Sequence, residues 1–335
     1  MSDDVRAYHQ LSKHRPEQFA PGPGQLDWAT QPAPFRRYDG ARLIELWHRP
    51  QEESPPFDSV YAAPSASVQP LNRASLSQLL YDSLALSAWK EAGGNRWALR
   101  VNPSSGNLHP TEAYLLLPAG ALEEGALLAH YSSDVHALKV RAELPPALGA
   151  ALPADGCLLA LASIPWREAW KYGERAYRYC QHDLGHALAA LAIAASALGW
   201  QVRVLRGVDE VRLDSLFGLD REGFHEAEHV DCLLWIGPVR EREPTLPASL
   251  LNSLAALELS GRPNRLSRQY RDWPELARVH ALCRAAAQPP VPWTAAAGRQ
   301  ASDNPGLPLR PILHRRRSAQ AMDGKAGVTA ELLYA

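Results

Sequence analysis

The alternation of apolar and polar positions along the chain predicts helices packed against a small set of strands. From Ser75 onward, leucines recur at the spacing of one helix face, and Ser75 or Ser77 can cap the start of that helix. A longer alanine-rich run over 174–198 is almost uncharged after Asp183, which indicates a helix in the core. Short apolar runs bounded by Gly, Pro, Asp or Asn indicate strands at 113–117, 157–163, 201–205 and 232–236. Helices on a small mixed or antiparallel sheet make an α+β fold.

Two proline-rich segments flank this periodic part. Residues 1–60 combine prolines, arginines and aromatic side chains with little periodicity, which predicts an extended arm packed on the body. Residues 246–311 hold proline clusters around short leucine and alanine runs, as in a linker with a helix or two. We therefore expect the domain itself to span residues 61–245.

The segment 102–110 is the most informative stretch for function. Its sequence, NPSSGNLHP, cannot continue a helix or fill a central strand, so it predicts a shaped loop ahead of the strand at 113–117. Backbone N–H groups and small hydroxyls in such a loop suit a planar ligand rich in heteroatoms, because the main chain can approach it closely. An ordinary tight loop before a strand is the alternative.

Residues 103–110 resemble the Pro-Ser-Ser-x-Asn-x-Gln-Pro loop with which the flavin-dependent nitroreductase superfamily contacts the isoalloxazine ring of FMN. Segments 171–179 and 182–186, ahead of the alanine-rich helix, are similar to the SagB and thiazoline-oxidase branch of that superfamily. The opening segment 8–14 resembles the same branch. The resemblance covers most of residues 1–240. It implies the nitroreductase-like α+β fold and FMN as the cofactor.

The resemblance also assigns cofactor-binding residues. In the loop they are Pro103, Ser104, Ser105 and Asn107. Arg100, just before the loop, is the best candidate for a phosphate ligand, with a solvated surface arginine as the alternative. Arg206 and Gly207 stand where the family has a Glu-Gly pair whose backbone faces the flavin. Gly207 suits that place because a side chain would collide with the ring, whereas Arg206 departs from the usual acidic residue.

A second occurrence of the family pattern begins near residue 312. Residues 312–323 are similar to the Arg-x-Ser-x-Arg/Lys-x-Phe-Asp opening of nitroreductase domains, whose basic and hydroxyl groups bind the FMN phosphate. By this resemblance Arg316 and Ser318 belong to a phosphate site. Gln320 replaces the second basic residue and weakens that assignment.

Residues 328–334 then echo residues 75–81. The echo predicts that residues 312–335 begin a truncated second nitroreductase-like domain, and coincidence is the alternative. Family members are typically dimers that hold FMN at the subunit interface. The resemblance therefore implies a pseudo-dimer with a second half or a homodimer.

Lys171 and Tyr172 are the candidate catalytic residues. In azoline dehydrogenases of the SagB branch a Lys-Tyr pair lies over the flavin and serves the oxidation of thiazoline or oxazoline rings. FMN can accept a hydride from one ring carbon, but a proton must leave the adjacent carbon, and a desolvated Lys or a Tyr can be that base. A charged, solvated first helical turn is the alternative for this pair.

The predicted function is thus an FMN-dependent oxidoreductase of the SagB type acting on a small-molecule or peptide substrate. Azoline dehydrogenation is the specific hypothesis. Reduction of a nitro, quinone or ene group by NAD(P)H is the general alternative. The first half has no clear Arg-x-Ser-x-Arg of its own, so a degenerate scaffold for a catalytic partner half is a further alternative.

A zinc hydrolase is the competing interpretation of the helix start. His182 and His186 stand at i and i+4 on one helix face, with Asp183 where zinc hydrolases place a Glu as general base. The shorter Asp reaches a metal-bound water less easily, and spacing singles out no third ligand. We therefore predict no metal site.

Composition changes this picture little. The chain is 46% hydrophobic and 21% charged, as in ordinary globular proteins, and its formal net charge of -1 gives no general attraction to nucleic acid or anionic membranes. The longest uncharged apolar run, 187–200, is shorter than a membrane span. The four cysteines form no CxxC pair, and the first residues carry no secretory signal. We expect a cytoplasmic protein without nucleic-acid or membrane partners.

Overall fold

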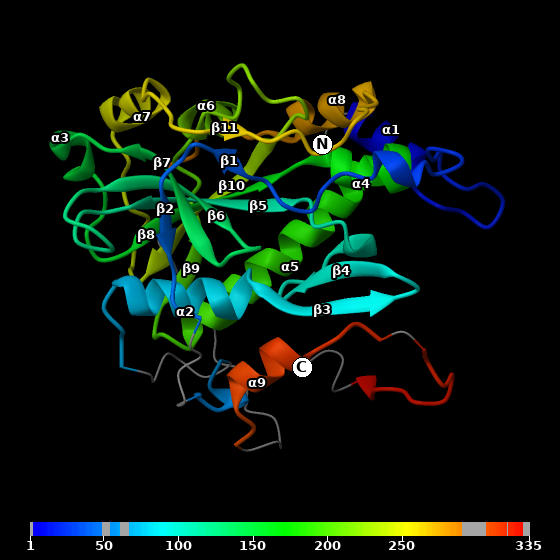
Figure 1. The fold of residues 1–335 in the computed structure, drawn as a ribbon, viewed down its shortest axis with the longest axis horizontal. Helices are drawn as coiled ribbons and strands as arrows, with labels where there is room; N and C mark the ends of the chain where they lie inside the picture. Colours follow the sequence, from blue (N-terminus) through cyan, green and yellow to red (C-terminus); the bar gives the residue numbers. More distant parts are fainter. Residues whose placement is uncertain (1–2, 49–53, 61–66, 290–305, 320, 331–335) are drawn as a thin grey trace.

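A seven-stranded antiparallel sheet forms the centre of the computed structural model, which describes residues 3–48, 54–60, 67–289, 306–319 and 321–330 (Figure 1). In sheet order the strands are β2 (Leu43–Glu45), β7 (Ala137–Glu143), β6 (Leu127–Ser132), β5 (Thr111–Leu117), β8 (Cys157–Ser163), β10 (His229–Gly237) and β9 (Gln201–Val204). Every residue of the central strands β5 and β8 is buried, because helices cover both faces of the sheet. The α+β fold expected from the sequence is confirmed.

Two helices, α2 (Arg73–Ser83) and α5 (Ala176–Ser196), cover one face of the sheet. The first residue before α2, Asn72, caps it: its Oδ1 accepts from the Ser75 amide at 3.1 Å, and the Ser75 hydroxyl accepts from the Asn72 amide at 3.0 Å. The N-cap residue is therefore Asn72, and Ser75 is the third residue of the helix. The expectation that Ser75 or Ser77 caps the helix is wrong. Alanines at the buried positions of α5 let that helix lie close to the strands.

Short helices cover the other face. They are α3 (Pro146–Gly149), α6 (Leu213–Phe217) and α7 (Ala248–Ala255). A third apolar cluster joins α1 (Asp3–Leu11), α4 (Pro165–Tyr172) and α8 (Pro274–Cys283) beyond one end of the sheet. The single-turn helices η1 (Trp28–Thr30), η2 (Phe57–Val60) and η5 (Glu210–Arg212) lie in connections.

The N-terminal segment is built into the body as well as packed on it. β1 (Tyr38–Asp39) pairs with β11 (Arg262–Pro263), and β2 then adds an edge strand beside β7. Residues 246–289, at the start of the predicted linker, contain α7 and α8. The domain boundaries drawn from the sequence remain predictions.

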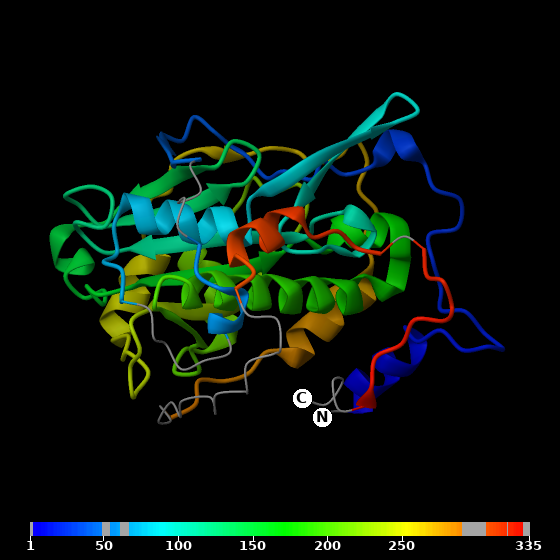
Figure 2. The same cartoon turned by 90° about the horizontal axis from the view of Figure 1, so that it is seen from below.

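A hairpin of β3 (Leu86–Ala92) and β4 (Asn95–Arg100) projects from the body outside the main sheet (Figure 2). Its turn, Gly93-Gly94, has φ of 56° and 77°, a left-handed pair that glycine adopts without strain. α9 (Leu309–Arg315) lies against α2 and beside β3.

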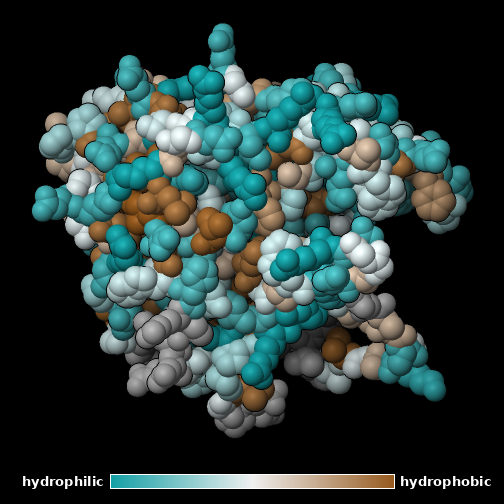
Figure 3. All heavy atoms as spheres, viewed as in Figure 1, coloured by the Kyte–Doolittle hydropathy of each residue, from teal (hydrophilic) through white to brown (hydrophobic). Residues whose placement is uncertain are grey.

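The face seen in Figure 1 is mainly hydrophilic, with apolar residues in scattered patches (Figure 3). Among the described residues, no helix combines the length and the apolar character needed to cross a lipid bilayer.

Candidate functional site

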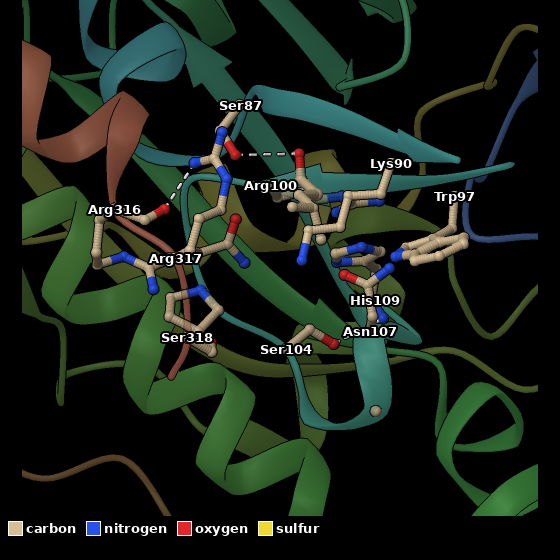
Figure 4. Close-up of a pocket in the computed structure, with 14 residues that line it drawn as sticks. Ser87, Lys90, Trp97, Arg100, Ser104, Asn107, His109, Arg316, Arg317 and Ser318 are labelled. Carbon is tan, nitrogen blue, oxygen red and sulfur yellow. Dashed lines mark hydrogen bonds between the residues drawn. The ribbon is translucent and has the colours of Figure 1, made fainter. Parts of the chain in front are cut away.

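A cavity of about 270 Å³ lies between a loop, the β3–β4 hairpin and the chain after α9 (Figure 4). We call residues 102–109 the loop wall, residues 316–318 the C-terminal wall, and Lys90 with Trp97 the hairpin end. The hairpin and the loop wall follow each other in the sequence, whereas the C-terminal wall comes from much further along, with Arg316 215 residues from Val101. Of the residues predicted to bind the cofactor, the cavity is lined by Arg100, Pro103, Ser104, Asn107, Arg316 and Ser318.

The loop wall has an unusual backbone. It contains the single turn η3 (Ser105–Asn107), and Gly106, Asn107 and His109 have φ of 56°, 60° and 54°. Positive φ at His109 is strained, so surrounding contacts must hold it. The Ser104 hydroxyl accepts from the His109 amide at 2.8 Å, which closes the loop on itself.

Asp183 of α5 anchors the loop wall from below the cavity. Its carboxylate accepts from the amide and the hydroxyl of Ser105, at 2.9 and 2.8 Å. Burial raises the pKa of Asp183, whereas the hydrogen bonds from the two loop serines lower it. Ser105 was predicted to bind the cofactor, but the structure directs its donors to Asp183. Sequence reasoning missed this role, although Asp183 is the last acidic residue of α5.

Three buried polar atoms in residues that line the cavity have no hydrogen-bond partner among the described residues: Arg100 Nε, Asn102 Oδ1 and His109 Nδ1. Burial, and then the charge of Arg100, lower the pKa of His109 to about 3, so its ring is neutral. Its Nε2–H donates to the Ala98 carbonyl at 3.1 Å, which leaves Nδ1 as a bare acceptor. Buried polar atoms are normally paired, so these atoms indicate a place for a ligand.

Arg100 fits neither interpretation drawn from the sequence. It is buried, and its guanidinium donates to the carbonyls of Thr111 at 2.9 Å and Pro34 at 2.8 Å. Those donors are therefore not free for a phosphate. Arg100 fixes the base of the loop wall instead.

The C-terminal wall is held by polar contacts of α9. Asp82 of α2 accepts from Arg310 Nε and from His314 Nε2, each at 3.0 Å. Just after the end of α9, Arg316 donates to the carbonyl of Val101 at 3.1 Å, directly before the loop wall. The structure thus brings Arg316 and Ser318, assigned by resemblance to a second domain, beside the Pro-Ser-Ser loop.

Lys171 and Tyr172 end α4 and touch the loop wall at Gly106. A Cβ placed on Gly106 would lie 2.5 Å from the Tyr172 hydroxyl and 3.0 Å from Lys171 Nζ. The two side chains do not line the cavity itself. Burial, with smaller effects of Glu168 and Tyr179, raises the pKa of Tyr172 to about 12, so the phenol keeps its proton. The pair lies in the last turn of its helix, not in the solvated first turn considered as the alternative.

Glu168, one turn before this pair, is a buried acid that sequence reasoning missed. Both of its carboxyl oxygens lack a hydrogen-bond partner among the described residues. Burial, and then the nearby charge of Asp183, raise its pKa well above the usual range, so it is a neutral acid. No sequence pattern marks it, because its burial depends on tertiary packing.

Arg206 and Gly207 lie elsewhere. Their backbone amides donate to Glu243 Oε1 at 2.9 and 2.7 Å, and neither residue lines the cavity. The structure therefore does not bring Gly207 to the loop wall.

The two histidines of the zinc-hydrolase alternative are exposed. His182 and His186 stand on the open side of α5 and belong to no cluster of possible metal ligands in the described part of the chain. Such a cluster forms elsewhere, from Asp214, His229 and His280. Arg284 donates to Asp214 at 2.7 Å and to His280 Nε2 at 2.9 Å, so a guanidinium already supplies the positive charge there.

Comparison with solved structures shows the fold. A nitroreductase structure from Anabaena variabilis is 24% identical, with a TM-score of 0.62, and the match covers 96% of this chain and 65% of that one. A nitroreductase structure from Ralstonia eutropha is 19% identical, with a TM-score of 0.45 and coverage of 66% and 97%. The E. coli microcin synthetase McbBCD complex with truncated pro-MccB17 bound is 19% identical, with a TM-score of 0.41 and coverage of 61% and 77%. The last two similarities are too low to support any statement about this chain.

No curated protein matches the chain. The model of the nitroreductase family matches residues 69–237, which is half of the sequence and contains the loop wall, α5 and six of the seven sheet strands. The chain belongs to the nitroreductase family.

Proposed function

We propose that this chain forms part of an FMN-dependent oxidoreductase and that the cavity holds the cofactor. One observation carries the proposal: the C-terminal wall meets the loop wall through the bond from Arg316 to Val101, across 215 residues of sequence. Both segments resemble FMN-binding motifs. Their meeting at one cavity is not implied by either motif alone.

The residues present fit FMN. Arg316, Arg317 and the Ser318 hydroxyl offer charge and donors that suit a phosphate group. The unpaired His109 Nδ1 and Asn102 Oδ1 suit the N–H and O–H groups of a hydroxylated heteroaromatic ligand. Members of the nitroreductase family generally bind FMN, which supports the same assignment.

Bound FMN would supply two-electron chemistry to this site. In the specific hypothesis, dehydrogenation of an azoline ring, the proton that leaves the ring carbon passes to the amine of Lys171. Tyr172 keeps its proton and acts as a hydrogen-bond donor, because its pKa is raised to about 12. Reduction of a nitro, quinone or ene group with NAD(P)H is the general alternative, and it needs no base at Lys171.

The proposal includes a partner for the open side of the site. This partner is a second nitroreductase-like half that begins near residue 312, or a second copy of the chain. The resemblance of residues 312–323 to the opening of a family domain supports the first form.

The test compares binding of FMN and riboflavin, which differ by the phosphate. We expect Arg316→Ala to weaken FMN binding about tenfold or more, as for loss of a charge-assisted contact, and to leave riboflavin binding unchanged. Arg315→Ala is the matched control, because Arg315 is exposed and does not line the cavity. Fluorescence titration measures both ligands. Absence of FMN binding by the unaltered protein would favour the scaffold alternative.

A second measurement tests the catalytic pair. Lys171→Ala should slow oxidation of an azoline peptide by about 10²-fold while FMN binding persists, as for loss of a positioned base. Tyr172→Phe should reduce the rate less, because it removes a donor only. Equal rates in all three proteins would leave the general reductase as the better hypothesis.

A further inference from the structure

The β3–β4 hairpin carries two tryptophans with different surroundings. Trp89 is 46% exposed, but Phe35 lies beside it and the Arg96 guanidinium carbon stands 4.3 Å from its ring centroid. Trp97 is 36% exposed and lines the cavity. Among the described residues, no aromatic ring or cation stacks on Trp97. Its indole face is therefore available to a flat ligand.

Lys90 stands directly opposite Trp97 in the hairpin register, so both side chains lie on the same face. Within the described ranges, no carboxylate forms an ion pair with Lys90. Figure 4 shows Lys90 and Trp97 near His109, whereas Arg316 and Ser318 lie across the cavity. The hairpin end thus combines the exposed indole face of Trp97 with the ammonium group of Lys90, which has no ion-pair partner among the described residues.

The positive charges at the two ends of the cavity, Lys90 at one end and Arg316 with Arg317 at the other, suit two different anionic groups. FMN has one phosphate, which the proposed function places at the C-terminal wall. Its oxidised ring system is neutral, so it leaves the charge of Lys90 unmatched.

We infer that the hairpin end binds the substrate, and that the substrate is a planar conjugated ring bearing an acidic group. Trp97 stacks on the ring, and Lys90 pairs with the acid. This inference rests on the proposed function, because it assigns the other end of the cavity to the cofactor. It adds the substrate's charge and shape, which the family alone does not fix.

The test uses a pair of probes of equal shape, 4-nitrobenzoate and 4-nitrobenzamide, titrated into FMN-saturated protein by calorimetry. We expect the unaltered protein to bind the anion at least about fivefold more tightly than the amide, as for one ion pair. Lys90→Met should remove this preference. Trp97→Ala should weaken both probes by roughly tenfold, and Trp89→Ala, on the opposite face of the same hairpin, should change neither.

Separate FMN titrations of each variant distinguish this inference from the proposed function. If Lys90→Met or Trp97→Ala lowers FMN affinity, the hairpin end serves the cofactor and the inference is overturned. Equal affinity of the unaltered protein for the two probes also overturns it. If the protein binds no FMN, the proposed function fails, and the probe preference and its dependence on Lys90 are then measured in the FMN-free protein. Trp97→Phe, which keeps a stacking ring, replaces Trp97→Ala if the latter does not fold.

Discussion

The loop wall is fixed by buried contacts of the domain, whereas the C-terminal wall depends on the contacts of one short helix, among them the Asp82 carboxylate. Ser105 is held by Asp183 of α5, in the body that carries the sheet, and the His109 ring donates to the Ala98 carbonyl of β4. The C-terminal wall follows a seven-residue helix whose side chains meet at Asp82. We therefore expect that the C-terminal wall can be released without unfolding the core, whereas the loop wall cannot.

The largest effect should come from substitution of Gly173, directly after the Lys171 and Tyr172 side chains that touch the loop wall at Gly106. Gly173 ends α4 with φ 54° and ψ -129°, and a Cβ there would lie 2.9 Å from Gly22 Cα and 3.0 Å from the Trp273 ring. We expect Gly173→Ala to lower the free energy of unfolding by about 3 kcal/mol or more, since backbone strain and a clash add.

Urea denaturation measures that loss. Gly120→Ala is the control, because Gly120 also has positive φ but has no atom within 4 Å of the added Cβ. The control should lose only about 1 kcal/mol. Similar losses at both positions would show that the contacts of Gly173 do not matter.

Asp82→Asn should release the C-terminal wall and leave the loop wall in place. Arg310 is 3% exposed, so weakening its ion pair with Asp82 should cost about 2–3 kcal/mol locally. Hydrogen exchange of α9 should rise, while exchange in β5 and β8 stays slow. Asp220→Asn, at an exposed position, is the control. Unchanged exchange in α9 would show that other contacts hold it.

His109 should make the loop wall sensitive to acid. Its pKa is about 3 in the folded chain, below the ordinary value of 6.5 that applies when the chain is unfolded. As the pH falls below 6.5, His109 therefore binds a proton in the unfolded chain but not in the folded chain. The free energy of unfolding decreases as a result.

Between pH 6.5 and pH 5 this loss should be about 1.6 kcal/mol. His109→Gln, which introduces the residue of the resembling motif, should show a shallower decline in urea denaturation over that interval. His280, whose pKa is also about 3, stays in both proteins and cancels in the comparison. Parallel pH profiles would show that His109 is not buried as a neutral ring.

The smallest effect should come from Gly185→Ala on the exposed side of α5. No atom lies within 4 Å of the added Cβ, so the alanine should stabilise the helix by about 0.5–1 kcal/mol. Thermal unfolding measures the gain, and FMN affinity should not change. A loss of stability would indicate that another surface packs on α5 in solution.

Sequence patterns predicted those strands that are buried because their own residues are apolar. The runs that became β5, β8, β9 and β10 are apolar and bounded by turn residues, and their ends differ from the structure by at most a few residues. β6 and β7 were missed because their runs contain His130, Lys139 and Arg141. The structure explains two of these: His130 pairs with Glu112 at 2.8 Å, and Arg141 donates to the Gly261 carbonyl at 2.8 Å. Such partners are tertiary and leave no local pattern.

The site was predictable only as far as its motifs extend. The resemblance singled out residues 103–107, Arg316 and Ser318, which the structure places around one cavity or directly beneath it. Lys90, Trp97 and Glu168 carry no motif, because their relation to the cavity depends on how the hairpin and α4 pack. The Gly93-Gly94 pair, flanked by tryptophans, was a hairpin signal that could have been recognised.

The large sequence separation between Asp82 and His314, which are in contact, has a consequence for biosynthesis. The two residues are 232 positions apart. At about 5–20 residues per second, a ribosome needs roughly 10 to 50 seconds to pass from one to the other. During that interval the strands of the sheet can pair, but the nascent chain lacks Arg316 and Ser318. In the proposed function, a phosphate-bearing ligand is therefore retained only after residues 316–318 have been made, when the scaffold around the site has already formed.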